Sequence, residues 1–344
     1  MTALLLGVDG GNTKTLALVT ALDGGAAGVG NAGCADIHNA SSPELALDEI
    51  VKACTAALAA AGANAGDLAA AAFSLAGADW PEDFALLRRE LGSRLGLRSE
   101  PEVVNDAVGA LRCGTTDTVG VAAVIGTYGA VAGRSARGDL FHLGFWPDSA
   151  GAFALGSEAL AAVWRHMIDL GPATSLTNRA LARWRCSDAG ELLYAFTRTG
   201  GLPASEPGLF ADAVLDEAEA GDPVAVEIVR RVGGRLGDYA HVCASRTGQL
   251  GASFPLVLCG GVLRHRSPLL RSAIHERIPD AQPVYPDVEP VVGAVLIAAD
   301  RIGVRPDLQC LRSASTGSGA STGPLATAGA AARRGSGVAS DETA

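Results

Sequence analysis

An acidic residue, two glycines and several hydroxyl residues follow one another in residues 7–15, whose sequence is GVDGGNTKT. Apolar runs flank this segment, and a Gly-Gly pair between such runs predicts a tight hairpin turn, because glycine adopts positive φ without a Cβ clash. The backbone N–H groups of such a turn can also surround an anion, and Asp9 can hold a Mg²⁺ for phosphoryl chemistry. From this segment alone, an ordinary hairpin and a phosphate-binding turn are equally good interpretations.

Two further glycine turns come directly after apolar runs. One is Gly126-Thr127-Tyr128-Gly129, after residues 119–125, and the other is Gly260-Gly261, after residues 256–259. The chain has no Gly-Lys pair, which excludes a Walker-type P-loop. The G-x-G-x-x-G pattern at residues 28–33 precedes a loop with a proline and not a helix, so a dinucleotide site is not favoured. Three glycine turns at strand ends predict backbone donors that converge on one polyphosphate.

A second group of polar residues is found at another strand end and in a later loop. Asn105-Asp106 follows a short strand predicted at 102–104, and the sites of α/β proteins collect at strand ends. A carboxylate there can accept the proton of an attacking hydroxyl, although a helix-capping aspartate would give the same pattern. Trp146 and Asp148 lie in a loop with glycine and proline, where an aromatic face and a carboxylate suit a sugar. A plain surface turn is the alternative.

The composition limits the classes of protein to consider. With 344 residues, 48% hydrophobic and 19% charged, the chain is globular and has room for two domains. The net charge of -10 argues against nucleic-acid binding. No apolar stretch has the length of a membrane span, and the start of the chain lacks the basic region of a secretory signal. Seven scattered cysteines without a C-x-x-C pair predict reduced thiols. We therefore expect a soluble, cytoplasmic protein.

Predicted strands and helices alternate along the chain, which is typical of a layered α/β fold. Each half begins with a strand, a glycine turn and a second strand, which predicts a duplicated fold with a cleft between two lobes. The first lobe would comprise residues 1–116 with a returning helix at 290–304, and the second lobe would comprise residues 117–289. From residue 312 onward Ser, Thr, Gly and Ala dominate, which predicts a disordered tail over 312–344.

Six segments occur in an order that is typical of one family. They are DGGNTKT (9–15), SLAGAD (74–79), NDA (105–107), IGTYGAV (125–131), LCGGV (258–262) and EPVVGAVLIA (289–298). This order resembles the BadF/BadG/BcrA/BcrD ATPase family, to which N-acetylglucosamine kinases belong. The resemblance spans residues 4–305 and implies the two-lobed actin-like ATPase (ribonuclease H-like) fold. It also implies ATP and Mg²⁺ as cofactors, a small-molecule sugar as substrate, and a homodimer.

The resemblance further implies roles for individual residues. Asp106 would be the base that deprotonates a sugar hydroxyl, and Asp9 would bind the metal. The nucleotide would be bound by Gly10, Gly11, Asn12, Thr13, Lys14, Gly126, Thr127, Tyr128, Gly260 and Gly261. The sugar would be bound by Asp36, His38, Asn39, Gly77, Asp79, Asn105, Trp146 and Asp148.

Three departures from the family pattern lie on the acceptor side. Tyr128 replaces a glycine of the second glycine turn, the loop around Asp148 is shorter and lacks a glutamate, and Asp36 takes the place of an asparagine. We therefore expect phosphoryl transfer from ATP to a hydroxyl of a hexosamine. Because an unpaired charge in a closed cleft costs several kcal/mol, Asp36 favours a free amino group over an N-acetyl group.

Two other functions fit the same fold. A non-catalytic sugar or nucleotide sensor is favoured by the unusual residues 126–129 and 148–151. An ATPase activator of a 2-hydroxyacyl-CoA dehydratase would need a cysteine pair after the second glycine turn, and the sequence has no such pair there.

Overall fold

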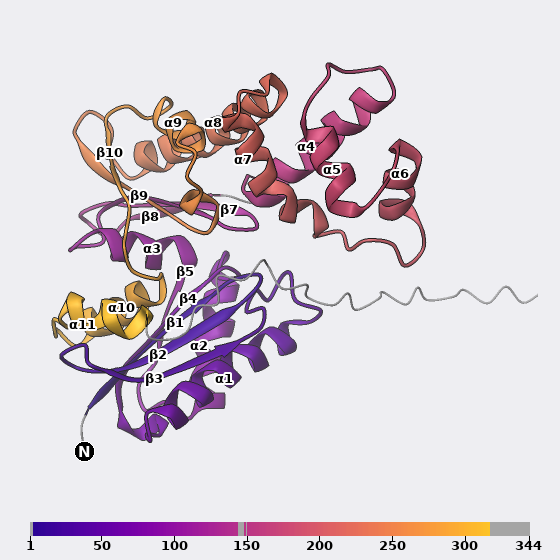
Figure 1. Ribbon diagram of the computed structural model, residues 1–344. Helices are drawn as coiled ribbons and strands as arrows, with labels where there is room; N and C mark the ends of the chain where they lie inside the picture. The colour runs from indigo at the N-terminus through magenta and orange to yellow at the C-terminus, as the bar shows by residue number, and fades with distance from the viewer. Residues whose placement is uncertain (1–2, 144–147, 149, 317–344) are drawn as a thin grey trace, which may run out of the picture.

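The computed structural model describes residues 3–143, 148 and 150–316, and its chain forms two α/β lobes (Figure 1). The first lobe contains a five-stranded sheet with the order β3-β2-β1-β4-β5. Its strands are β1 (Leu4–Gly10), β2 (Thr15–Ala21), β3 (Ala26–Ala32), β4 (Leu68–Leu75) and β5 (Glu102–Asn105). Strand β1 pairs antiparallel with β2 and parallel with β4, so the sheet is mixed.

The second lobe repeats this topology. Its strands are β6 (Gly120–Ile125), β7 (Gly129–Arg134), β8 (Leu140–Leu143), β9 (Phe254–Cys259) and β10 (Ala281–Val284), in the order β10-β9-β6-β7-β8. Strand β6 pairs antiparallel with β7 and parallel with β9, as β1 does with β2 and β4. The expected duplicated α/β fold is therefore confirmed, and both sheets have the same strand order and directions.

Alternating side chains of the first sheet pack against helices on its two faces. Leu4, Leu6 and Val8 of β1 belong to a buried cluster with helices α1 (Pro43–Ala60) and α2 (Pro81–Leu95). Leu5, between them in sequence, packs into a second cluster with helix α10 (Val291–Arg301). Successive side chains of a strand point to opposite faces, so this uninterrupted apolar run is needed for a sheet that is covered on both sides.

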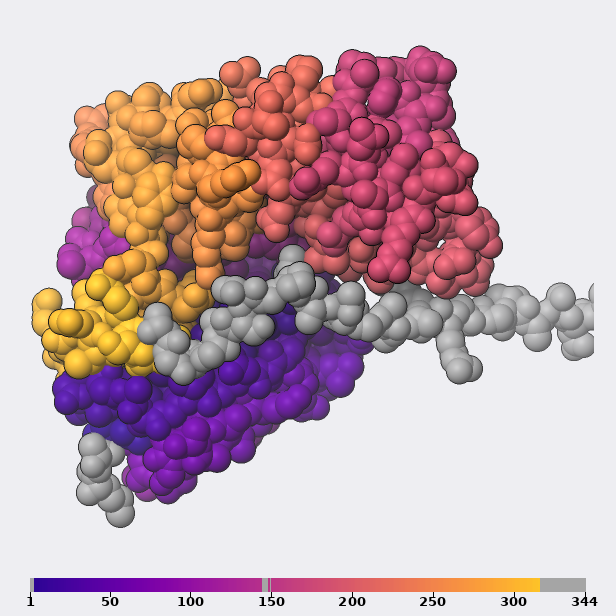
Figure 2. Space-filling view, in the orientation of Figure 1, coloured from indigo at the N-terminus to yellow at the C-terminus, as the bar shows by residue number. Residues whose placement is uncertain are grey.

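Two helices connect the lobes. Helix α3 (Asp106–Gly114) leads from the first sheet to the second, and α10 returns the chain to the first lobe. A Cβ atom at Gly293 of α10 would lie 1.9 Å from the backbone oxygen of Gly109 in α3, so only glycine permits this crossing. An ion pair of 2.8 Å between Arg112 and Asp300 also joins the two helices. Figure 2 shows the second lobe, in magenta to orange, above the first lobe, in indigo and purple.

Most of the remaining helices belong to the second lobe. They are α4 (Ala152–Met167), α5 (Leu176–Trp184), α6 (Ala189–Thr197), α7 (Ala211–Glu219), α8 (Pro223–Arg246) and α9 (Leu269–His275), with short 3₁₀ helices at Ala65–Asp67, Glu206–Phe210 and Val262–Arg264. The long helix α8 covers one face of the second sheet, and α4–α7 extend to one side in Figure 1. None of the helices in the described ranges is both long and apolar enough to cross a membrane.

The tail begins later than the sequence predicted. Helix α11 (Leu308–Thr316) continues past residue 312, where the change in composition suggested that ordered structure ends. Leu311 and Ala314 of this helix are buried in the cluster that also contains α10. Residues three positions apart lie on the same face of a helix, so both side chains pack against this cluster, and the surrounding serines conceal the pattern in the composition. The rest of the predicted tail, residues 317–344, lies outside the described residues.

Candidate active site

The first glycine turn connects β1 and β2. The backbone N–H of Gly11 donates to the oxygen of Lys14 at 2.9 Å and closes the turn. A Cβ atom at Gly10 would lie 2.6 Å from side-chain atoms of both Ala35 and Leu75, so this glycine is required by packing. Asp9 immediately precedes it and lies opposite Leu16 in the hairpin. The carboxylate of Asp9 is thereby placed at the end of the central strand.

The second glycine turn connects β6 and β7 and is hydrogen-bonded to the start of helix α4. The N–H of Gly126 donates to the oxygen of Tyr128 at 3.0 Å. The oxygens of Gly126 and Thr127 accept from Ala152 and Phe153 at 3.0 and 2.9 Å. The ring of Tyr128 remains partly exposed and lies 5.6 Å from that of Phe153, at an angle of 50°. The first turn of α4 thus fixes the conformation of this turn.

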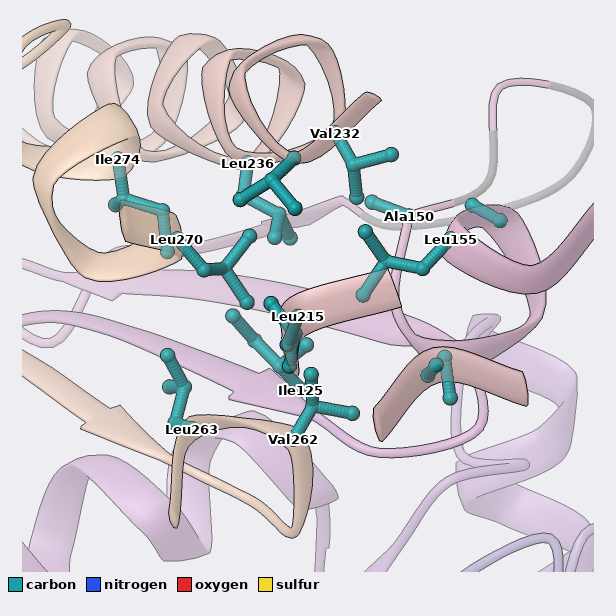
Figure 3. Close-up of a cluster of buried hydrophobic side chains, with 14 of the residues drawn as sticks. Ile125, Ala150, Leu155, Leu215, Val232, Leu236, Val262, Leu263, Leu270 and Ile274 are labelled. Carbon is teal, nitrogen blue, oxygen red and sulfur yellow. The ribbon is translucent and has the colours of Figure 1, made fainter. Parts of the chain in front are cut away.

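The third glycine turn follows β9 and packs against the second. Gly260 has φ +110°, and a Cβ there would lie 2.4 Å from the backbone oxygen of Ile125. Figure 3 shows that Ile125 and Val262 belong to a buried apolar cluster with residues of α8 and α9, such as Leu236 and Leu270. Because protein cores are closely packed, this cluster gives the second and third turns a rigid support.

The first and second turns meet across the two lobes. The Oγ1 atoms of Thr13 and Thr127 lie 3.4 Å apart. The third turn reaches the same place, because the thiol of Cys259, directly before Gly260, is close enough to Asp9 and Asp106 for both carboxylates to raise its pKa. The three turns that the sequence singled out therefore lie close to one another.

Three glycines at these turns have no evident role in the packing of the chain. Gly11 and Gly126 would place a Cβ no closer than 3.7 Å and 3.9 Å to another atom, and Gly261 would place one in open space. Gly261 has helical φ and ψ of -59° and -42°, which any residue adopts. Glycine at such positions lets a ligand approach the backbone closely. These residues fit a bound polyphosphate such as that of ATP.

The surroundings of Asp9 fit a cation. The pKa of Asp9 is raised to about 7, first by burial and also by the charges of Asp106 and Glu289, against the opposing charge of Lys14. Several carboxylates in one place repel one another unless a cation neutralises them. Within residues 3–143, 148 and 150–316, no three His, Cys, Asp or Glu side chains are arranged to hold a metal ion. A Mg²⁺ at Asp9 would therefore complete its coordination with phosphate oxygens and water.

Asp106 is the first residue of helix α3. Asn105 caps this helix, because its side-chain oxygen accepts from the N–H of Ala107 at 3.1 Å. Asn105 therefore performs the capping role that Asp106 could have had. The Oδ1 atom of Asp106 is buried and has no hydrogen-bond partner in the described part of the chain. Burial raises the pKa of Asp106 to about 6, Asp36 adds to this effect, and the N–H of Ala107 opposes it.

Two further carboxylates of the first lobe lie near Asp106. The pKa of Asp79 is raised to about 7, first by burial and also by the charges of Asp36 and Asp106. The side-chain amide of Asn105 donates to Asp79 at 3.1 Å and to the oxygen of Ala78 at 3.3 Å. The three carboxylates therefore occupy one region at the ends of β4 and β5.

The turn that contains Asp36 is tied to the beginning of helix α2. The Asp36 carboxylate accepts from the N–H of His38 at 2.9 Å and from both nitrogens of Asn39 at 3.3 and 2.8 Å. His38 in turn contacts Asp83 at 2.9 Å. Burial alone would lower the pKa of His38, but the hydrogen bond to Asp83 raises it overall. A Cβ at Gly77 would lie 2.7 Å from the N atom of Ile37, so glycine is needed where these two loops touch.

Two predicted sugar-binding residues are not part of this group in the described contacts. The Asp148 carboxylate contacts Tyr239 at 2.9 Å and Arg235 at 3.5 Å, and both of these residues belong to α8. No described hydrogen bond or ion pair joins Asp148 to Asp36, Asp79 or Asp106. Trp146 lies outside the described residues.

Three residues of the site were not identified from the sequence. Asp83 accepts from the N–H groups of Asp79 and Trp80 as well as from His38, and an acid two residues after Pro81 is a helix-start signal that could have been noticed. Glu289 acts on Asp9 and pairs with Arg264 at 3.2 Å. His142 contacts Asp79 from the second lobe, and no sequence signal indicated it.

Comparison with known proteins agrees with the fold and the motifs. The chain is 23% identical over 310 residues to the N-acetyl-D-glucosamine kinase of Dictyostelium discoideum, covering 86% of this chain and 97% of that protein. The crystal structure of a putative N-acetylglucosamine kinase from Chromobacterium violaceum superposes with a TM-score of 0.65 at 20% identity, covering 86% and 99% of the two chains. A glucokinase of the ROK family from Streptomyces griseus, solved with glucose and AMPPNP, gives a TM-score of 0.54 at 19% identity, covering 86% and 98%.

The two structural likenesses establish the fold, which is that of sugar kinases with the actin-like ATPase architecture. The sequence match to a family extends over residues 6–298, which include all three glycine turns, the Asn105-Asp106 pair and most of α10. The protein therefore belongs to the BadF/BadG/BcrA/BcrD ATPase family.

Proposed function

We propose that the protein is an ATP-dependent sugar kinase that transfers the γ-phosphoryl group of Mg-ATP to a hydroxyl of a hexosamine. The observation that carries this proposal is the position of Asp106. One oxygen of its carboxylate is buried without a hydrogen-bond partner in the described chain, and its charge acts both on Asp9, beside the first glycine turn, and on Asp79. The names of the relatives, two N-acetylglucosamine kinases and a glucokinase, support the same activity.

In this proposal the chain itself supplies a base and a set of hydrogen-bond donors for the phosphate oxygens of ATP. Asp106 accepts the proton of the acceptor hydroxyl, and a pKa of about 6 suits a base that works near neutral pH. The N–H groups of the glycine turns and the hydroxyls of Thr13 and Thr127 bind the phosphate oxygens. Asp9 would hold a Mg²⁺, which balances charge on the transferred group. Approach of the lobes excludes water, the competing acceptor.

The acceptor site favours an amino group that carries a positive charge. Asp36, Asp79 and Asp106 act on one another, and His38 is the cation that opposes them at Asp79. The Asp36 carboxylate already accepts three hydrogen bonds from its own turn. Asp79 accepts one, from Asn105. A sugar ammonium would therefore bind beside Asp79, in the field of Asp36, and a neutral N-acetyl group would leave these charges unbalanced.

A coupled assay of ADP release tests this proposal. The acceptors are glucosamine and other hexosamines, their N-acetyl forms, neutral hexoses and cyclitols, each with Mg-ATP. We expect ADP release that depends on an unacetylated hexosamine. Preference for the N-acetyl form would overturn the proposed binding of a sugar ammonium, but the proposed kinase activity would still stand. Binding of a sugar without ADP release would instead identify a sensor.

A further inference from the structure

A contact on the acceptor side of the molecule joins the two lobes. Nε2 of His142, in strand β8 of the second lobe, lies 2.9 Å from the backbone oxygen of Asp79, in the loop after β4 of the first lobe. A carbonyl oxygen only accepts hydrogen bonds, so Nε2 carries the proton in this contact. Burial lowers the pKa of His142, and the hydrogen bond to Asp79 partly opposes this effect. The neutral ring is therefore favoured, and it suffices for the contact.

Three different elements determine the position of Asp79. Its carboxylate accepts from Asn105, which caps α3, and its N–H donates to Asp83 of α2 at 3.2 Å. Its backbone oxygen accepts from His142. Of the hydrogen bonds that Asp79 makes in the described part of the chain, only the one with His142 joins it to the second lobe. The peptide that carries the Asp79 carboxylate is therefore held partly by the opposite lobe.

His142 is also connected to the second glycine turn. In the second sheet it lies opposite Ala132 of β7, and β7 starts at Gly129, directly after Tyr128 of that turn. Strands that are joined by a ladder of backbone hydrogen bonds move together. A displacement of the second turn relative to the first lobe therefore moves His142 relative to Asp79.

We propose that His142 is a positioning residue that links the placement of the second phosphate-binding turn to the orientation of Asp79 in the acceptor site. This inference rests on the proposed function in one respect, the binding of the acceptor beside Asp79. The Thr13–Thr127 contact joins the lobes on the nucleotide side, and the His142–Asp79 contact joins them on the acceptor side. A closed arrangement that satisfies both contacts aligns donor and acceptor.

The test compares His142→Ala and His142→Gln with the wild-type protein. Glutamine carries an N–H donor at the same number of bonds from the backbone as Nε2 of histidine, so it can restore the contact. His241→Ala is the matched control, because His241 is exposed on helix α8. Hydrogen–deuterium exchange of residues 76–80 in the substrate-free protein gives a readout that needs no kinase activity. Thermal unfolding shows whether each variant is folded.

We expect His142→Ala to increase amide exchange in residues 76–80 several-fold and to raise the KM for the sugar about tenfold, with the KM for ATP within about twofold. His142→Gln and His241→Ala should resemble the wild type in both measurements. Unchanged exchange in His142→Ala, or no rescue by glutamine, would overturn the inference. If the wild type phosphorylates no sugar, the proposed function fails, and the exchange data still decide whether His142 holds Asp79.

Discussion

The hydroxyl oxygens of Thr13 and Thr127 lie 3.4 Å apart, although 114 residues separate them in the chain. Thr13 lies two residues after Gly11 and Thr127 directly follows Gly126, each in the turn of a β-hairpin. The two hairpins occupy equivalent positions in the two sheets. Duplication of one fold has thus produced two similar turns, and the packing of α3 against α10 brings them face to face. A ligand that fills this space contacts both lobes at once.

The threonine pair predicts that the two turns cooperate in binding one phosphate group. Thr13→Ala and Thr127→Ala should each weaken ATP binding, and the double variant should lose less than the sum of the two effects. Residues in direct contact show interaction energies of about 0.5–3 kcal/mol, and we expect a value in this range from the KM for ATP. Thr197→Ala, in helix α6 and bonded to its own helix, serves as the control. Strict additivity of Thr13 and Thr127 would mean that the turns do not share a ligand.

Gly261→Ala separates nucleotide binding from folding. The new Cβ would meet no protein atom within 4 Å and the backbone is already helical, so stability should stay equal or rise by about 0.4–1 kcal/mol. If a nucleotide lies against this backbone, the KM for ATP should rise roughly tenfold, which corresponds to about 1.4 kcal/mol.

The matched control for Gly261→Ala is Gly190→Ala in helix α6, where the new Cβ would lie 3.2 Å from a side-chain oxygen of Asp188. This variant should leave the KM for ATP unchanged. Normal ATP affinity in Gly261→Ala would remove the third turn from the nucleotide site.

The pH dependence of turnover should report the state of the acceptor-site carboxylates. Asp106 acts as a base when ionised, and its pKa is about 6, so kcat/KM should rise as the pH increases through that value. Asp79 titrates nearby with a pKa of about 7, and the two carboxylates titrate as a coupled pair. We expect the half-maximal rate between pH 6 and 7.

In Asp36→Asn the rise of kcat/KM with pH should occur at lower pH than in the wild type. The reason is that the charge of Asp36 raises the pKa of both Asp79 and Asp106. The turn should survive the change, since a rotated Asn39 amide can still bond to the new side chain. The same variant should also lose its preference for a free amine over an N-acetyl group. If kcat/KM rises over the same pH range in Asp36→Asn as in the wild type, Asp36 does not act on the base.

Asp9 should destabilise the substrate-free protein at high pH. Its pKa is about 7 in the folded state, against an ordinary value of 3.8, so between these values the folded state binds more protons than the unfolded state. Stability then falls as the pH rises from 4 to 7. Asp9→Asn removes this effect, and its free energy of unfolding should exceed that of the wild type by more at pH 8 than at pH 5.

Urea denaturation at the two pH values measures the effect of Asp9. Asp188→Asn is the control, because the backbone N–H of Glu191 holds the pKa of Asp188 below its ordinary value. Its difference from the wild type should therefore be the same at pH 5 and pH 8. A constant difference for Asp9→Asn would contradict the raised pKa.

Much of the first lobe could be predicted from local patterns. The Gly10-Gly11 turn lies between two strands, and the strand before Asn105-Asp106 ends at Asn105, because apolar alternation and turn glycines determine these features locally. Helix α8 also has a strong local signal, since a proline follows its capping residue Asp222 and a long apolar pattern comes after it. The strong local signals therefore belong to the first glycine turn, the strand before Asn105-Asp106 and this helix.

The parts that escaped prediction depend on tertiary contacts. Strand β8 has only four residues, none of which is fully buried, so its sequence has no clear period and His142 remained unnoticed. The His38–Asp83 contact joins residues that are 45 positions apart, and nothing near either residue indicates the other. The Asp36 substitution was visible in the sequence, but the hydrogen bonds that its own turn supplies were not.

The central claim is that Asp106 deprotonates an acceptor hydroxyl beside a triphosphate held by the three turns. The most direct measurement follows Mg-ATP and the preferred hexosamine by phosphorus NMR with the wild type and with Asp106→Asn. We predict one sugar phosphomonoester for each ADP formed by the wild type, and a rate at least about 100-fold lower with Asp106→Asn at nearly unchanged sugar affinity. Release of inorganic phosphate in place of a sugar phosphate, or normal turnover by Asp106→Asn, would contradict the account.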